Sequence, residues 1–137
     1  MAEKKVPINK AQLEEIIKEF PTPFHLYVEE AIRKNVRRLQ AAFAWVPQFK
    51  EHFAVKATPN PYILKILKEE GCGADCSSLA ELIIAEKTGL KGEDIVLTSN
   101  VTPFEEYRKA RELGAIINID DISHIPYLEK HAGFSDL

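Results

Sequence analysis

A lysine follows a short apolar run at a point where the chain then breaks its regular structure. The run is Phe53-Ala54-Val55, the lysine is Lys56, and residues 58–61 form a turn-forming Thr-Pro-Asn-Pro cluster. Apolar neighbours remove part of the hydration of an amine, which disfavours its ammonium form. A neutral lysine amine is a nucleophile that condenses with carbonyl groups to give a Schiff base. These residues therefore indicate carbonyl chemistry, with a lysine that reaches from a strand end into water as the alternative.

Polar or ionisable residues also end the apolar stretches that follow along the chain. In α/β folds the chemistry gathers at the carboxyl ends of the parallel strands. We therefore expect the following residues to lie with Lys56 at one edge of a sheet: Asp75, Cys76, Ser77, Ser99, Asn100 and Asp120.

The elements that would position these residues alternate between strand and helix four times over residues 51–133. Successive strands start about 20 to 25 residues apart, a spacing typical of βαβ units and a parallel sheet. Two architectures fit, a doubly wound open sheet or consecutive units of a (β/α)8 barrel. A complete barrel takes roughly 250 residues, so 137 residues would hold about half of one. The expected strands are 51–57, 73–77, 94–99 and 115–120, and the expected helices are 61–71, 78–89, 103–114 and 122–133.

Three elements are expected before this repeat. Apolar residues at helical spacing predict a helix over 10–19 with Asn9 as its N-cap. The alternation in "FHLYV" predicts a strand over 24–28, and a long amphipathic helix should follow over 29–43. We expect an N-terminal helical extension over 1–23 and an incomplete barrel domain over 24–137.

Composition and motifs exclude several other classes of protein. A net charge of −3 gives no reason to expect nucleic acid or an anionic membrane as a partner. No run is long and apolar enough to span a membrane, so we expect a cytoplasmic protein. No Gly-x-Gly-x-x-Gly or P-loop motif is present for dinucleotides or nucleoside triphosphates. Two cysteines, Cys72 and Cys76, suggest reduced structural thiols rather than a disulfide or a metal site.

Several ordered motifs resemble one enzyme family over residues 20 to 137. "FAVKATPNP" is similar to the lysine motif of the fold-type III pyridoxal-phosphate enzymes that decarboxylate diaminopimelate, ornithine and arginine. "TPFHLYVEEAIRKNVRRLQAAF" resembles the entry to their barrel, and "GCGADCSSLAEL" resembles their Gly-x-Gly-x-Asp-x-x-Ser-x-x-Glu segment. "IVLTSNVTPFEEYRKARELGA" and "INIDDISHIPYLE" match the next two units. The resemblance implies an alanine-racemase-like (β/α)8 TIM barrel, of which this chain is an incomplete part.

The resemblance also implies roles for individual residues. Lys56 would hold pyridoxal 5'-phosphate as a Schiff base, and Asp75 would lie close to the cofactor and this lysine. Glu81 matches a family glutamate, but it is explained equally well as the capping partner of Ser78. Nothing in the sequence ties His25, His52 or His124 to the cofactor.

We therefore expect the full-length protein to be a pyridoxal-phosphate-dependent amino-acid decarboxylase. The residues that follow Lys56 in this motif favour meso-diaminopimelate as substrate, with L-lysine as product. They thus favour a role in lysine biosynthesis. No metal is expected, and the family pattern implies a homodimer. In the family, the phosphate loop and partner-subunit residues lie later in the chain, so we expect the present chain alone to be inactive. The alternatives are an ornithine- or arginine-type decarboxylase and a non-catalytic, cofactor-binding or regulatory homologue.

Overall fold

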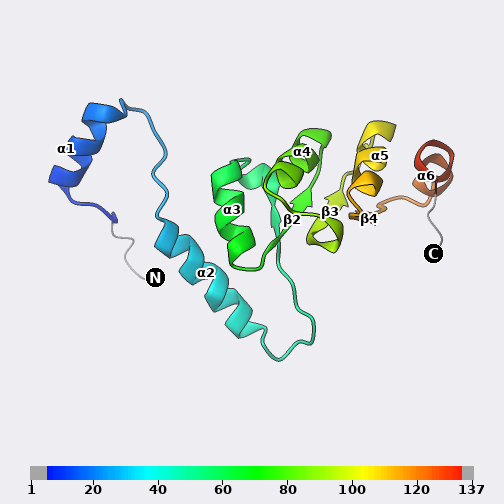
Figure 1. Ribbon diagram of the computed structural model, residues 1–137, viewed down its shortest axis with the longest axis horizontal. Helices are drawn as coiled ribbons and strands as arrows, with labels where there is room; N and C mark the ends of the chain where they lie inside the picture. Colours follow the sequence, from blue (N-terminus) through cyan, green and yellow to red (C-terminus); the bar gives the residue numbers. More distant parts are fainter. Residues whose placement is uncertain (1–5, 134–137) are drawn as a thin grey trace.

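The computed structural model describes residues 6–133 of the chain. Two helices come first, α1 (Lys10–Glu19) and α2 (Glu29–Ala42). Strands and helices then alternate, as Figure 1 shows, which confirms the predicted repeat over residues 51–133. Their bounds are β1 (His52–Ala54), the 3-10 turn η1 (Val55–Ala57), α3 (Pro61–Glu69), β2 (Gly73–Cys76), α4 (Leu79–Lys87), the 3-10 turn η2 (Gly92–Asp94), β3 (Ile95–Thr98), α5 (Phe104–Glu112), β4 (Ile116–Asn118) and α6 (His124–Ala132).

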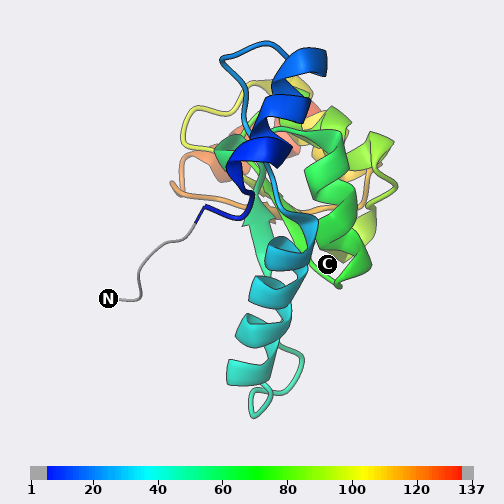
Figure 2. The same ribbon diagram turned by 90° about the vertical axis from the view of Figure 1, so that its left-hand side faces the viewer.

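The four strands form one parallel sheet in the order β1-β2-β3-β4. A doubly wound sheet reverses its strand order and carries helices on both faces. Here the order follows the sequence, and α3 to α6 pack on one face through a shared core. In Figure 2, α3 and α4 lie to one side of the strands. The sheet is therefore an arc of a (β/α)8 barrel, as predicted, and the doubly wound alternative is wrong.

The main core lies between the sheet and these helices. Side chains of a strand alternate between its two faces, and one face of β2 and β3 is fully buried against the helices. Burying a large apolar side chain contributes about 1.5–3 kcal/mol, so this layer is the main source of stability. Its buried residues are Val55, Leu64, Ala74, Cys76, Leu82, Ala85, Leu90, Ile95, Leu97, Tyr107, Ala110 and Leu128.

Side chains of one helix close the carboxyl end of the next helix along the chain. Gln40 of α2 donates a 2.6 Å hydrogen bond to the carbonyl oxygen of Glu70 after α3. Lys68 of α3 donates to the carbonyl oxygens of Thr88 and Gly89 after α4, at 3.1 and 2.9 Å. Because the last carbonyls of a helix lack intrahelical partners, these cations and amides satisfy them. Arg111 of α5 likewise donates to the carbonyl oxygens of Ala132, the last residue of α6, and of Gly133, which follows it. We call these contacts the forward caps.

A cluster of ion pairs attaches α2 to α3. The Glu70 side chain is only 8% exposed and accepts from Arg33 Nη1 at 3.0 Å and from Arg37 Nε at 2.7 Å. Arg33 also pairs with Glu29 and Glu69, each at 2.6 Å. The two arginines hold the pKa of Glu70 to about 2, below its ordinary value of 4.5. This cluster fixes the helix that leads into β1.

Two predictions about the first elements need correction. The helices over 10–19 and 29–42 are confirmed, with Asn9 as N-cap of α1, but residues 24–28 are not a strand. A strand needs a neighbour for its backbone hydrogen bonds, and no strand of the described residues pairs with this segment. It runs as an extended connection between α1 and α2 in Figure 1. Leu26 and Tyr27 are 43% and 48% exposed there.

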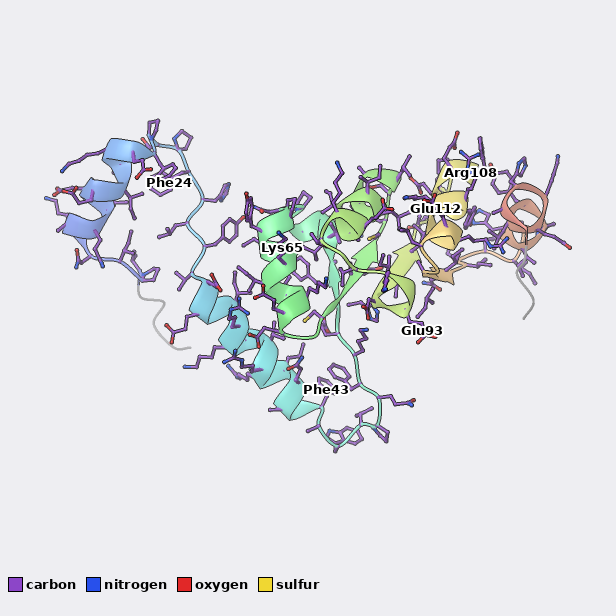
Figure 3. The ribbon with its side chains drawn as sticks, viewed as in Figure 1. Phe24, Phe43, Lys65, Glu93, Arg108 and Glu112 are labelled. Atoms are coloured by element: carbon purple, nitrogen blue, oxygen red, sulfur yellow. The ribbon has the colours of Figure 1, made fainter. Side chains whose placement is uncertain are left out.

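The second correction concerns the end of β1. The strand was expected to run through Lys56 to residue 57, but it stops at Ala54 and the chain tightens into η1. Lys56 therefore lies in a single 3-10 turn, one step beyond the sheet. The loop at the opposite end of β1 carries exposed aromatic residues, including Phe43, which Figure 3 shows at the turn after α2.

Candidate cofactor site

Among residues 6–133 the helices that follow the strands, α3 to α6, pack on one face of the sheet, and the opposite face corresponds to the interior of the barrel. The strand register sets Ala54 of β1 beside Asp75 of β2, and Asp75 beside Val96 of β3. Further toward the carboxyl ends, Thr98 of β3 lies beside Asn118 of β4. These residues alternate with the helix-facing core residues, so they share the opposite face.

Lys56 lies at the carboxyl edge of this face, two residues beyond Ala54. Val55, its neighbour in η1, is buried at 1% exposure and anchors the turn in the main core. The Lys56 side chain itself is exposed. The expectation of a partly dehydrated lysine is therefore wrong for the described residues, because nothing in them covers the carboxyl end of β1.

Asp75 provides an acceptor on the same face. Its Oδ1 atom is buried and has no hydrogen-bond partner within residues 6–133. A buried carboxylate oxygen without a donor costs free energy of about 1–3 kcal/mol or more, so such an atom indicates a missing donor. Asp75 pairs in register with the strand that leads into Lys56, so a donor group bound near Lys56 could reach it.

The loop from β2 to α4 is fixed by carboxylates. Ser78 caps α4 by accepting from the backbone N–H of Glu81 at 3.4 Å, which confirms its predicted capping role. The Glu81 carboxylate accepts from the backbone N–H of Ser77 at 2.9 Å, one residue before the cap. Glu106 of α5 accepts from the backbone N–H of Leu79 at 3.1 Å. Acidic groups thus already occupy the amino end of α4, where a phosphate could otherwise bind.

The ends of β3 and β4 are joined by side chains. Asn100 Nδ2 donates to Asp120 Oδ2 at 3.1 Å. Asp120 Oδ1 is 3.2 Å from His124 Nδ1, which is also 3.2 Å from the hydroxyl of Tyr107. The structure thus brings together two residues expected at the strand ends, Asn100 and Asp120. Sequence reasoning missed the partners Tyr107 and His124; the spacing of four residues between Asp120 and His124 was the available signal.

The two cysteines take no part in this edge, and the expectation that Cys76 would lie there with Lys56 is wrong, because its side chain is buried in the main core. Cys72 and Cys76 are free and buried, which agrees with the predicted structural thiols. Burial raises the pKa of the Cys76 thiol to about 12, and burial also raises the pKa of Cys72. Both are therefore neutral at physiological pH and poor nucleophiles.

The residues at this edge fit a cofactor that carries an aldehyde. Lys56 is an accessible primary amine. The Asp75 oxygen that finds no donor among residues 6–133 can accept a hydrogen bond from a bound group.

Within residues 6–133 no three His, Cys, Asp or Glu side chains gather closely enough to hold a metal ion. No helix in the same part of the chain is both long and apolar enough to cross a membrane.

Comparisons with known proteins agree with this geometry. Residues 29–137 match the family described as pyridoxal-dependent decarboxylase, pyridoxal binding domain. The chain is 49% identical over 111 residues to Protein TabA of Pseudomonas amygdali pv. tabaci, a match that covers 81% of this chain and 26% of TabA. It is 34% identical over 126 residues to the diaminopimelate decarboxylase of Methanothermobacter thermautotrophicus, covering 91% of this chain and 29% of that enzyme.

A solved structure extends the likeness to the fold. The diaminopimelate decarboxylase of Methanocaldococcus jannaschii superposes with a TM-score of 0.80 at 32% identity, covering 85% of this chain and 28% of that chain. The present chain therefore spans less than a third of the length of these relatives. Because the family model matches most of its residues and the lysine motif lies within them, the chain belongs to the pyridoxal-dependent decarboxylase family.

Proposed function

We propose that this chain is the lysine-bearing part of an enzyme that decarboxylates an amino acid with pyridoxal 5'-phosphate. The observation that carries the proposal is that Lys56 follows β1 by two residues while Asp75 lies on the neighbouring strand β2, in register with Ala54. Lys56 is an exposed amine at the carboxyl end of β1. On the adjoining strand, Asp75 has a buried carboxylate oxygen that finds no hydrogen-bond donor among residues 6–133. The activity belongs to the complete protein, and we expect the present chain alone not to turn over substrate.

Each residue has a task that its position allows. The Lys56 amine would attach the cofactor covalently, and the aldehyde-bearing cofactor supplies the electron sink for loss of carbon dioxide. Asp75 would accept a hydrogen bond from the bound group and keep negative charge beside the attachment point. Glu81 would act indirectly, since its carboxylate fixes the backbone of Ser77 directly after β2.

We propose meso-diaminopimelate as the substrate, which gives L-lysine on decarboxylation. The 34% identity to a diaminopimelate decarboxylase over most of the chain supports this choice. A second candidate is an amino acid other than diaminopimelate, because the identity to TabA is higher, at 49%. The homodimer and the cytoplasmic location stay predictions.

Covalent trapping tests the role of Lys56. The chain is incubated with pyridoxal phosphate, reduced with borohydride, digested and analysed by mass spectrometry. We expect the reduced cofactor on the peptide that contains Lys56, and none in a Lys56→Ala variant. Lys65, an exposed lysine of α3 labelled in Figure 3, provides the control, because Lys65→Ala should leave the Lys56 adduct unchanged.

Two results would count against the proposal. One is cofactor spread evenly over surface lysines, with no excess on the Lys56 peptide. The other is a complete enzyme that carries the adduct but releases no carbon dioxide from any amino acid, which would favour the non-catalytic homologue. Release from diaminopimelate, ornithine and arginine, compared at equal concentration, decides between the substrates.

A further inference from the structure

A series of close polar contacts runs from the buried core to the carboxyl end of the sheet, where Lys56 follows β1. It starts at Tyr107, which is 1% exposed in the core between α5 and the sheet. Its hydroxyl lies 3.2 Å from His124 Nδ1, and the same nitrogen lies 3.2 Å from Asp120 Oδ1. The other oxygen of Asp120 accepts from Asn100 Nδ2 at 3.1 Å. We call these four residues the rim relay.

The rim relay ends at the carboxyl ends of β3 and β4, the same end of the sheet at which Lys56 follows β1. Asn100 and Asp120 each lie two residues beyond the paired Thr98 and Asn118. Both residues lie where the chain has left the strand and bends. The hydrogen bond between Asn100 and Asp120 therefore joins the two chain segments just beyond the carboxyl ends of β3 and β4. With Nδ2 held by Asp120, the Asn100 Oδ1 atom is the group left to accept a hydrogen bond at this edge.

The position of the ring protons decides which bond His124 Nδ1 makes. When Nδ1 carries a proton, in the charged ring or in the neutral Nδ1–H tautomer, it donates to Asp120 Oδ1. When Nδ1 has none, it accepts from the Tyr107 hydroxyl and can no longer bond Asp120. The charged or titratable groups facing His124 are Asp120, Asp121 and Tyr107, from the β4–α6 turn and from α5. The charged ring always carries the Nδ1 proton and so always donates to Asp120, whereas the neutral ring does so only as its Nδ1–H tautomer.

We infer that His124 and Asp120 are positioning residues that orient the side-chain amide of Asn100 at the cofactor edge, and that protonation of His124 tightens this arrangement. The inference rests on the proposed function for its role in the enzyme, but the relay itself does not depend on the cofactor. A surface hollow of about 380 Å³ lies beside it, lined by Asn100, Val101, Thr102, Ser123, His124 and Tyr127. Solvent protons can therefore reach His124, whose side chain is 26% exposed.

NMR of the isotopically labelled chain tests the relay directly. The histidine ring signals and the Asn100 side-chain amide signals are followed from about pH 5 to pH 8, the range in which histidines titrate. We expect the Asn100 amide to shift with the same midpoint as the His124 ring. His25, which is exposed, and the amide of Asn118 serve as references within the same sample. An Asn100 amide that does not follow His124 overturns the inference.

Two variants show whether the coupling passes through Asp120. His124→Gln and Asp120→Ala should each abolish the pH-dependent shift of the Asn100 amide while the His25 signal titrates as before. Retention of the shift in either variant contradicts the relay. Should Asp120→Ala fail to fold, His124→Gln alone decides, because glutamine preserves a polar side chain without a titrating group.

The complete enzyme separates failure of the relay from failure of the proposed function. In a His124→Gln enzyme we expect the borohydride adduct on Lys56 to form to the same extent as in the unchanged enzyme. The pH dependence of its kcat should differ in shape from that of the unchanged enzyme. An unchanged profile with normal adduct overturns the role of the relay in the enzyme, whereas absence of the adduct from the unchanged enzyme contradicts only the proposed function.

Discussion

The carboxylate of Glu106 in α5 accepts a 3.1 Å hydrogen bond from the backbone N–H of Leu79, the first residue of α4. One helix thus caps the amino end of its neighbour, beside the loop that follows Asp75. The second oxygen, Oε2, is buried and has no partner within residues 6–133. A negative charge at this end of a helix is favourable because the helix dipole is positive there.

Glu106→Ala should lower the free energy of unfolding by about 1–2 kcal/mol, because it removes a cap. Glu106→Gln should lower it less, since the amide oxygen can still accept from the backbone N–H of Leu79. Urea unfolding of both variants measures the difference. Glu105→Ala, one residue earlier, is the matched control and should change stability by no more than about 0.5 kcal/mol. Equal losses in Glu106→Ala and Glu105→Ala would contradict the capping role.

The ion pairs of Glu70 predict a specific dependence of stability on pH. Since Arg37 and Arg33 hold its pKa to about 2 against an ordinary 4.5, the folded state favours the ionised form. The stabilisation is therefore complete above the ordinary value and is lost as the pH falls from 4.5 toward about 2. Glu70→Gln should destabilise the chain at neutral pH, and its difference from the unchanged chain should shrink over that window.

Urea unfolding at successive pH values measures this effect. Glu69→Gln provides the comparison, because Glu69 bonds the same Arg33 but its side chain is 61% exposed. Exposed ion pairs contribute little, so its curve should lie close to that of the unchanged chain. A Glu70→Gln penalty that stays constant down to about pH 2 would show that the ion pairs do not cause it.

The thiols of Cys72 and Cys76 should not react with thiol reagents in the folded chain. Burial raises the pKa of Cys76 to about 12 and raises that of Cys72, so neither forms the reactive thiolate at neutral pH. A disulfide reagent such as DTNB should therefore release no colour from the native chain and react with both cysteines in denaturant. Ala80→Cys, at an exposed position of α4, should add one fast-reacting thiol. Rapid reaction of the unchanged chain would mean that the core opens readily.

Lys56→Ala should abolish decarboxylation in the complete enzyme without harming the fold. The side chain is exposed, and exposed substitutions away from special backbone positions change stability by no more than about 0.5 kcal/mol. Carbon dioxide release and urea unfolding, measured on the same preparation, check the two parts. Residual activity within tenfold of the unchanged enzyme would exclude covalent attachment through Lys56 as the essential step.

Local residue patterns were sufficient to predict most of the barrel arc. Gly71 and Gly89 end α3 and α4 with φ of +86° and +81°, a backbone region in which glycine carries no steric penalty. Helix ends marked by glycine, and the apolar stretches between them, depend on a few neighbouring residues and can therefore be predicted from the sequence alone. The parallel direction of the strands then follows from the short crossovers.

Features that depend on distant partners could not be predicted in the same way. Residues 24–28 have the alternation of a strand, but a strand forms only where another strand can pair with it. The exposure of Lys56 depends on what lies above the carboxyl end of β1, which its own neighbours do not determine. The contact between Tyr107 and His124 joins α5 to α6 through side-chain directions that helical spacing alone does not give.

The forward caps have a consequence for how the chain is made. In each cap the donor side chain precedes the carbonyl it binds in the sequence: Gln40 precedes Glu70, and Lys68 precedes Thr88. During synthesis from the amino end, the donor has therefore left the ribosome before the helix end that it secures. Where such a cap exists, the nascent polypeptide can fold in the order of translation, because the capping side chain is already present when the next helix end emerges.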